Sequence, residues 1–173
     1  MDILVLAPTG KARVRIKKNL DDYGLDNIQA KTIHQHLNEY GWLNEDFELR
    51  SEGGRKKSVD TVIIDECSML AIDLFSTLIK SIDFSRVKRF IMSGDPNQLP
   101  PIGPGRPFDD IVRLLSNDKK ISDHITNLRV RVRHKENKES LSLRLADGFL
   151  RDFKSKDIEE RALMNRNERY CYF

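Results

Sequence analysis

The feature that most constrains the fold is a short apolar run that ends in two acidic residues. Residues 59–64 read Val-Asp-Thr-Val-Ile-Ile, and Asp65 and Glu66 follow directly. A run this short and this rich in β-branched residues predicts a strand over residues 62–65 that is buried on both faces, as in a parallel sheet flanked by helices. Open α/β sheets bind ligands beyond the carboxyl ends of their strands, which is where these two carboxylates lie.

The residues themselves leave two interpretations of the acidic pair open. An Asp-Glu pair at a strand end suits metal-assisted phosphate chemistry, in which one carboxylate holds Mg²⁺ and the next orients and deprotonates a water. The alternative is an ordinary strand that leads into a helix with acidic residues in its first turn, which the helix dipole favours. The rest of the chain has to decide between them.

The composition is that of a polar, soluble globular chain long enough for one domain with a core. Of its 173 residues, 33% are charged and 39% are hydrophobic, and the formal net charge is +3. We see no apolar run near the length of a membrane span and no signal-peptide pattern. The two cysteines, Cys67 and Cys171, give no disulfide framework or zinc spacing, so we expect a cytoplasmic setting. The small positive charge permits a nucleic-acid partner without arguing for one.

Apolar runs and turn residues predict the elements around this strand. Residues 3–7 and 90–93 predict two more buried strands, each followed by a polar loop, and residues 11–20 predict a helix. A second helix would start at Thr32 as its N-cap, after a short strand at residues 28–30, and residues 40–58 are loop-like. An inward-facing helical stripe follows the central strand: Leu70, Leu74, Phe75, Leu78, Ile79 and Ile82. Strand, helix and strand in succession predict an α/β fold, a mainly parallel sheet with helices on both faces.

The C-terminal part shows weaker patterns. Residues 108–115 and 139–150 predict helices, and residues 125–132 alternate as a further strand candidate. Beyond Arg151 charges of both signs mix densely. We expect a first domain over residues 1–123 and a second segment over residues 124–173.

Gly10-Lys11 invites interpretation as a triphosphate-binding loop, but the surrounding residues do not fit. That loop needs a second Gly five positions before the Gly of the pair and a Ser or Thr directly after the Lys. Here those positions hold Val5 and Ala12. The strand and helix around Gly10 are therefore not predicted to hold a triphosphate.

Together, the loops resemble the motifs of superfamily 1 DNA helicases, specifically the branch of the exonuclease V alpha subunit. Residues 6–12 (Leu-Ala-Pro-Thr-Gly-Lys-Ala) are similar to motif Ia, and residues 32–37 (Thr-Ile-His-Gln-His-Leu) to motif Ib. Residues 65–69 (Asp-Glu-Cys-Ser-Met) match motif II, with Cys where Ala is usual. Residues 94–105 (Gly-Asp-Pro-Asn-Gln-Leu-Pro-Pro-Ile-Gly-Pro-Gly) match motif III almost letter for letter. Arg133-His134 resembles motif IV, where Arg-Gln is usual, and Arg131 is an alternative arginine.

The resemblance implies a RecA-like P-loop NTPase motor lobe that uses ATP and Mg²⁺. It implies that Asp65 binds Mg²⁺ through water, that Glu66 activates the attacking water, and that Gln98 senses the γ-phosphate. Arg133 would approach that phosphate from the second motor lobe as an arginine finger.

A second group of residues is implied in DNA binding. Contacts would be mostly to phosphates and sugars of single-stranded DNA, and hence without sequence preference, through Pro8, Thr9, Lys11, Thr32 and His34. The implied partners are single-stranded DNA, a duplex junction and the remaining parts of the helicase. The implied activity is 5′-to-3′ translocation and unwinding in recombination or repair.

The resemblance also implies parts that the 173 residues do not contain, namely the Walker A loop and the later motifs of the second lobe. We therefore expect a fragment of a helicase, comprising most of the first motor lobe and the entry to the second, which is inactive on its own. Two alternatives stay open. One is a stand-alone, non-catalytic protein that keeps the fold and a DNA-binding face, and the other is a P-loop ATPase that does not act on DNA.

Overall fold

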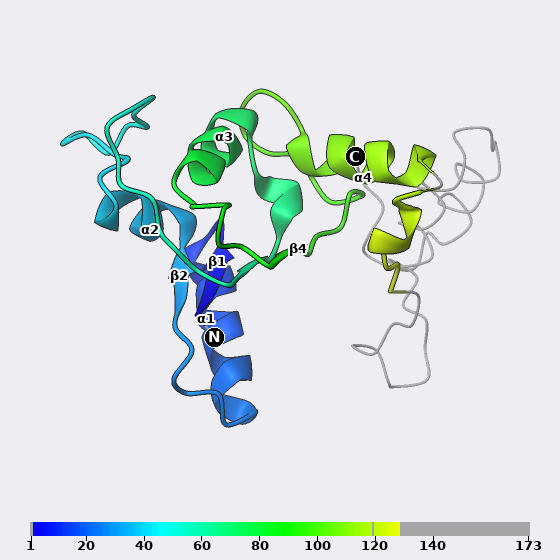
Figure 1. Ribbon diagram of the computed structural model, residues 1–173, viewed down its shortest axis with the longest axis horizontal. Helices are drawn as coiled ribbons and strands as arrows, with labels where there is room; N and C mark the ends of the chain where they lie inside the picture. The colour runs from blue at the N-terminus through cyan, green and yellow to red at the C-terminus, as the bar shows by residue number, and fades with distance from the viewer. Residues whose placement is uncertain (1, 119, 129–173) are drawn as a thin grey trace, which may run out of the picture. The chain divides into compact units, whose positions relative to one another are not determined.

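The computed structural model describes residues 2–118 and 120–128, and its centre is a parallel sheet (Figure 1). The strands of the described residues lie in the order β2-β1-β3-β4. They are β1 (Ile3–Ala7), β2 (Ala30–Thr32), β3 (Thr61–Ile64) and β4 (Arg89–Met92). All three pairings are parallel, so the predicted α/β class with a parallel sheet is confirmed.

Helices cover both faces of the sheet. Helix α1 (Gly10–Asp22) lies on one side, and α2 (Ile33–Glu39) and α3 (Ile72–Lys80) lie on the other (Figure 1). The 3₁₀ turn η1 (Cys67–Met69) follows β3, and α4 (Pro107–Asn117) and the 3₁₀ turn η2 (Ser122–His124) follow β4. Each connection between two successive strands therefore contains a helix, and it returns the chain to the edge of the sheet where the next parallel strand begins.

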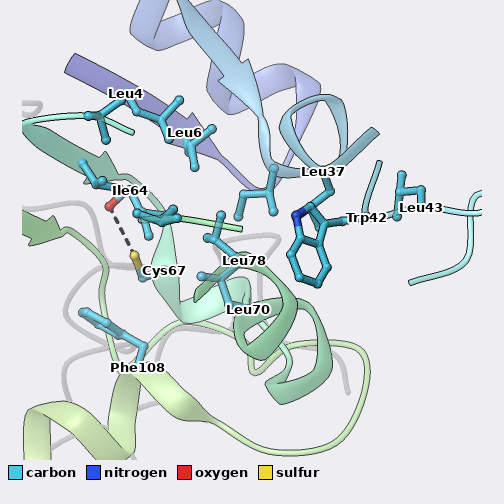
Figure 2. Packing of buried hydrophobic residues seen from close by; sticks show 14 residues of the cluster. Leu4, Leu6, Leu37, Trp42, Leu43, Ile64, Cys67, Leu70, Leu78 and Phe108 are labelled. Carbon is cyan, nitrogen blue, oxygen red and sulfur yellow. Dashed lines mark hydrogen bonds between the residues drawn. The ribbon is translucent and has the colours of Figure 1, made fainter. Parts of the chain in front are cut away.

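The main core lies between the sheet and helices α2 and α3. Alternate strand residues point into it, among them Leu4 and Leu6 of β1 and Ile64 of β3 (Figure 2). Side chains of the loops and helices complete it, with less than a tenth of each side chain exposed: Ile33, Leu37, Trp42, Leu43, Leu70, Leu78, Ile82 and Phe108. The hydrophobic burial of these residues fixes the strands whose ends carry the polar loops.

Three of the predicted strands agree with the observed ones to within a residue: residues 3–7, 62–65 and 90–93. The first is observed as predicted, and the other two start and end one residue earlier than predicted. The difference at their carboxyl ends is small because the backbone N–H of the residue just after each strand still donates a hydrogen bond to the neighbouring strand. The Asp65 N–H donates to the Leu6 carbonyl at 3.0 Å, and the Ser93 N–H donates to the Ile64 carbonyl at 2.8 Å.

Two predicted strands need correction. The short strand predicted at residues 28–30 lies two residues later, at Ala30–Thr32, because the Ile28 N–H still closes a turn onto the Leu25 carbonyl. The strand predicted at residues 125–132 is wrong for its described part, since residues 125–128 are irregular. Leu128 there is 94% exposed, and a strand needs a hydrogen-bonding neighbour that this segment does not have within the described residues.

The remaining predictions concern one loop and two helices. Residues 40–58 contain neither helix nor strand, as expected, although Leu43 and Leu49 form an isolated antiparallel bridge. The helix predicted at residues 108–115 is α4. The helix predicted at residues 139–150, and Arg131, Arg133 and His134, lie outside the described residues. None of the described helices is long and apolar enough to cross a membrane.

Candidate functional site

The carboxyl ends of the four described strands lie at one edge of the sheet because the strands are all parallel. The residues predicted for the site lie at or just after the carboxyl ends of the strands, in loops or in the first turn of the following helix. They are Pro8, Thr9 and Lys11 after β1, Thr32 and His34 at the end of β2, Asp65 and Glu66 after β3, and Gln98 after β4. Strands β3 and β4 are neighbours, so the acidic pair and the loop of Gln98 leave adjacent strand ends.

The acidic pair sits at a sharp break in the backbone. Asp65 still pairs with β1, but Glu66 has φ 56° and ψ 40°, a left-handed conformation that non-glycine residues seldom adopt. The next residue, Cys67, donates its N–H to the Ser93 carbonyl at 2.8 Å, which ties the loop after β3 to the end of β4. Such a conformation persists only where surrounding contacts hold it, and it recurs at functional sites.

Arg15 of α1 contacts both carboxylates, and the sequence analysis did not single it out. Its Nη2 atom lies 3.0 Å from Asp65 Oδ2 and 2.7 Å from Glu66 Oε1. These bonds, first to Glu66 and then to Asp65, raise the pKa of the Arg15 guanidinium. The only signal in the sequence is that Arg15 lies one helical turn after Lys11, which does not say that it faces the end of β3.

The two threonines predicted to contact DNA are engaged as helix caps. Thr9 Oγ1 accepts the Ala12 N–H at 3.2 Å at the start of α1. Thr32 Oγ1 accepts the Gln35 N–H at 3.1 Å, and Gln35 Oε1 accepts the Thr32 N–H at 2.9 Å, a reciprocal capping box. The predicted N-cap role of Thr32 is therefore confirmed.

The other residues predicted on the DNA side offer accessible groups. Lys11 and His34 are exposed in the first turns of α1 and α2, and Pro8 is half-buried at the end of β1. A lysine ammonium and an imidazole at one edge of a sheet suit contacts to phosphate and sugar.

Gln98 projects from a loop that is held at both ends. Asp95 starts it with a turn, in which its Oδ1 accepts the Asn97 N–H at 2.9 Å and its carbonyl accepts the Gln98 N–H at 3.0 Å. The far end is held by the Ile72 N–H, which donates to the Pro104 carbonyl at 2.9 Å. Gln98 itself is exposed, so its amide is free to meet a ligand at this edge.

The carboxylates suit a hard divalent cation such as Mg²⁺, which takes oxygen ligands and commonly only one or two protein carboxylates. The described residues hold no group of three or more His, Cys, Asp or Glu side chains that would form a metal site of their own. Cys67 adds no ligand, because it is fully buried and its thiol donates to the Ile64 carbonyl (Figure 2). Burial raises the pKa of this thiol to about 12, so Cys67 packs as a small core residue.

A parallel sheet with helices on both faces and polar loops at its carboxyl edge defines an α/β lobe of the RecA-like P-loop type. The family model of the AAA domain matches residues 1–104, and the chain belongs to this family.

Three relatives show what the chain is similar to. An uncharacterized protein of Methanocaldococcus jannaschii is 38% identical over 120 residues, which cover 65% of this chain and 10% of that protein. DNA helicase B of Mus musculus is 26% identical over 131 residues, which cover 75% of this chain and 12% of that protein. The RecBCD enzyme subunit RecD of Mycolicibacterium smegmatis is 25% identical over 125 residues, which cover 66% of this chain and 22% of that protein. The chain thus spans less than a quarter of each of these relatives.

One solved structure is a Pif1 helicase from Bacteroides in complex with ADP-AlF3 and single-stranded DNA. It matches 67% of this chain and 27% of its own, with 23% identity and a TM-score of 0.39. The similarity to DNA helicase B and to RecD supports the helicase relationship expected from the motifs. The exonuclease V alpha branch stays a prediction.

Proposed function

We propose that this chain forms part of the motor of a superfamily 1 DNA helicase, in the branch of the exonuclease V alpha subunit. The proposal rests on one observation: three kinds of functional group lie at the same edge of the sheet. Two carboxylates follow β3, an exposed amide (Gln98) follows the neighbouring β4, and an exposed lysine (Lys11) follows β1. Carboxylates and an amide can bind the Mg²⁺ and the phosphates of a nucleoside triphosphate, and a lysine can bind the phosphates of a nucleic-acid backbone.

On the nucleotide side, Asp65 would hold Mg²⁺, which when bound neutralises charge on the phosphate oxygens. Glu66 would accept a proton from the attacking water, since a carboxylate beside the strand end is a suitable general base. Gln98 would orient a γ-phosphate oxygen through its side-chain amide. Arg133 would supply a positive charge to the same phosphate from the segment beyond residue 128.

On the DNA side, Lys11 and His34 would contact phosphates and sugars of single-stranded DNA. The hydroxyls of Thr9 and Thr32 already accept backbone N–H groups, so these residues would act chiefly by fixing the first turns of their helices. Contacts of this kind carry no sequence information, so binding should be alike for all sequences. Movement along DNA, 5′-to-3′ unwinding and a role in recombination or repair are part of the same proposal.

The test is single-stranded DNA binding by the 173-residue chain, followed by fluorescence anisotropy over a range of salt concentrations. Lys11→Ala should weaken binding about equally for all sequences. It should also make the slope of log affinity against log salt shallower by roughly 0.7, the value for one phosphate contact on a single strand. The matched control is Lys56→Ala, an exposed lysine that precedes β3 and so lies at the opposite edge of the sheet.

The two variants separate a local contact from a general loss of charge. Lys56→Ala should leave both the affinity and the slope close to those of the unaltered chain. If both lysines changed the slope equally, or neither did, the assignment of Lys11 to DNA would be wrong. If the chain bound no single-stranded DNA at low salt, the DNA side of the proposal would fail as a whole.

A further inference from the structure

One guanidinium nitrogen joins the two carboxylates of the acidic pair. Arg15 Nη2 lies within 3.0 Å of an oxygen of Asp65 and of an oxygen of Glu66. Charge-assisted contacts of this length are hydrogen-bonded ion pairs. Arg15 lies five residues into α1 and more than forty residues before β3, so tertiary packing alone brings the three side chains together.

The backbone at Glu66 explains how one nitrogen reaches both acids. Successive side chains of an extended strand point to opposite faces, which would separate these two carboxylates. The left-handed conformation of Glu66 breaks this alternation. Both carboxylates then converge on the α1 side, where Arg15 meets them.

We propose that Arg15 is a positioning residue that holds Asp65 and Glu66 converged and occupies the place of a divalent cation, so that a cation must displace the guanidinium to bind. The inference rests on the proposed function, which assigns Asp65 to Mg²⁺. Two carboxylates around one cationic nitrogen form the environment that a divalent cation would otherwise take. In this arrangement the acidic pair is kept ready while no cation is present.

The exposure of the three side chains indicates a contact that opens readily. The exposed fractions are 42% for Arg15, 27% for Asp65 and 19% for Glu66. Ion pairs open to solvent to this degree are individually weak, because water screens them. Arg15 should therefore lower the affinity for a cation without blocking it, by about tenfold when two such weak contacts are combined.

The experiment measures Mn²⁺ binding to the 173-residue chain by the electron paramagnetic resonance signal of free Mn²⁺, since Mn²⁺ takes the same oxygen ligands as Mg²⁺. Arg15→Gln should bind Mn²⁺ about tenfold more tightly than the unaltered chain. Arg15→Lys should lie between the two, because lysine keeps the positive charge but its flexible stem and compact, strongly hydrated ammonium hold the two carboxylates less firmly. The gain should disappear when Arg15→Gln is combined with Asp65→Asn and Glu66→Gln.

The matched control is Lys18→Gln, which removes the same charge from an exposed side chain of the same helix. It should change Mn²⁺ affinity little, and thermal melting should show that every variant compared is folded. Equal affinities for Arg15→Gln and the unaltered chain, or equal gains for Arg15→Gln and Lys18→Gln, would overturn the inference. If Arg15→Gln did not change the Mn²⁺ affinity of the chain but Asp65→Asn abolished it, the assignment of Asp65 to the cation would stand without the role of Arg15. A gain that survived removal of both carboxylates would overturn the inference and the assignment of Asp65 together.

Discussion

The ring of Phe108 lies directly against Gly94. A Cβ atom at position 94 would stand 2.9 Å from Phe108 Cε1 and 3.1 Å from the Ser68 backbone nitrogen. Gly94 opens the loop of Gln98, Ser68 belongs to the turn after the acidic pair, and Phe108 is a core residue of α4. This close packing holds the loop after β4 against the turn after β3.

Gly94→Ala should destabilise the fold because the added methyl has no room. Overpacking of this kind costs about 1 to 3 kcal/mol in free energy of unfolding. Urea unfolding followed by fluorescence would measure it, since the chain has a single tryptophan and Trp42 is 5% exposed. Gly10→Ala is the control, because a Cβ there meets nothing within 4 Å, and it should cost no stability. Equal effects of the two substitutions would contradict the packing described for Gly94.

His36 is a buried neutral imidazole whose tautomer follows from its partner. Ser81 Oγ donates to the Leu78 carbonyl at 2.7 Å, so its contact with His36 Nε2 at 3.0 Å must be one that Nε2–H donates. Nδ1 then carries no proton, and it is buried without a partner among the described residues. Burial lowers the pKa of His36 to about 4. The charge of Glu39 opposes this shift, and those of Lys31 and Lys57 add smaller effects in the lowering direction.

Stability should therefore fall as pH is lowered from about 6.5 toward 4. The unfolded chain takes up a proton on His36 in this window and the folded chain does not, so acid favours unfolding. The loss should reach about 3 kcal/mol at most. Unfolding free energies measured by urea at pH 7 and pH 5 would show more than half of the effect. Above pH 5 the carboxylates with lowered pKa, which are Glu39, Asp60 and Asp83, contribute little.

Two histidine variants isolate this effect. His36→Leu should flatten the pH dependence between pH 7 and pH 5, because no titrating group remains at the buried position. His34→Gln should leave it unchanged, since His34 is exposed. A pH dependence that survived in His36→Leu would show that another group is responsible.

The capping box of α2 gives a third prediction. Thr32→Ala removes the oxygen that accepts the Gln35 N–H and should cost about 1 kcal/mol of unfolding free energy. Thr32→Ser keeps the hydroxyl and should cost much less. Thermal or urea unfolding of the two variants is the measurement, and a Ser variant as unstable as the Ala variant would show that the lost methyl, and not the cap, carries the effect.

The 173-residue chain by itself should hydrolyse no ATP at a meaningful rate, with or without single-stranded DNA. Glu66 and Gln98 can act only on a triphosphate that is held in place. The 173 residues contain no Gly-x-x-x-x-Gly-Lys-Ser or Gly-x-x-x-x-Gly-Lys-Thr pattern, which is the loop that holds one. A steady-state ATPase assay tests this. Turnover of roughly 1 to 100 per second, as in other phosphoryl-transfer enzymes, would show that another segment holds the nucleotide.

Much of the fold could be predicted from the sequence because the signals are local. A short apolar run that contains β-branched residues and lies between polar loops favours an interior strand, and this predicts Ile3–Ala7 and Thr61–Ile64 to within a residue. The N-cap at Thr32 and the helix of Ile72–Lys80 likewise depend on neighbours within one or two turns. The carboxylates were found for the same reason, since they directly follow a predicted strand.

Only the tertiary structure decided which distant side chains meet at this edge. The order β2-β1-β3-β4 places α1 so that Arg15 reaches Asp65 and Glu66, and no periodicity within α1 encodes that. The shift of β2 to Ala30–Thr32 came from a turn at Leu25 that competes with the strand. Local propensity determines where strands and helices form. Contacts between segments far apart in the chain depend on how the whole core packs, and the sequence pattern does not record this.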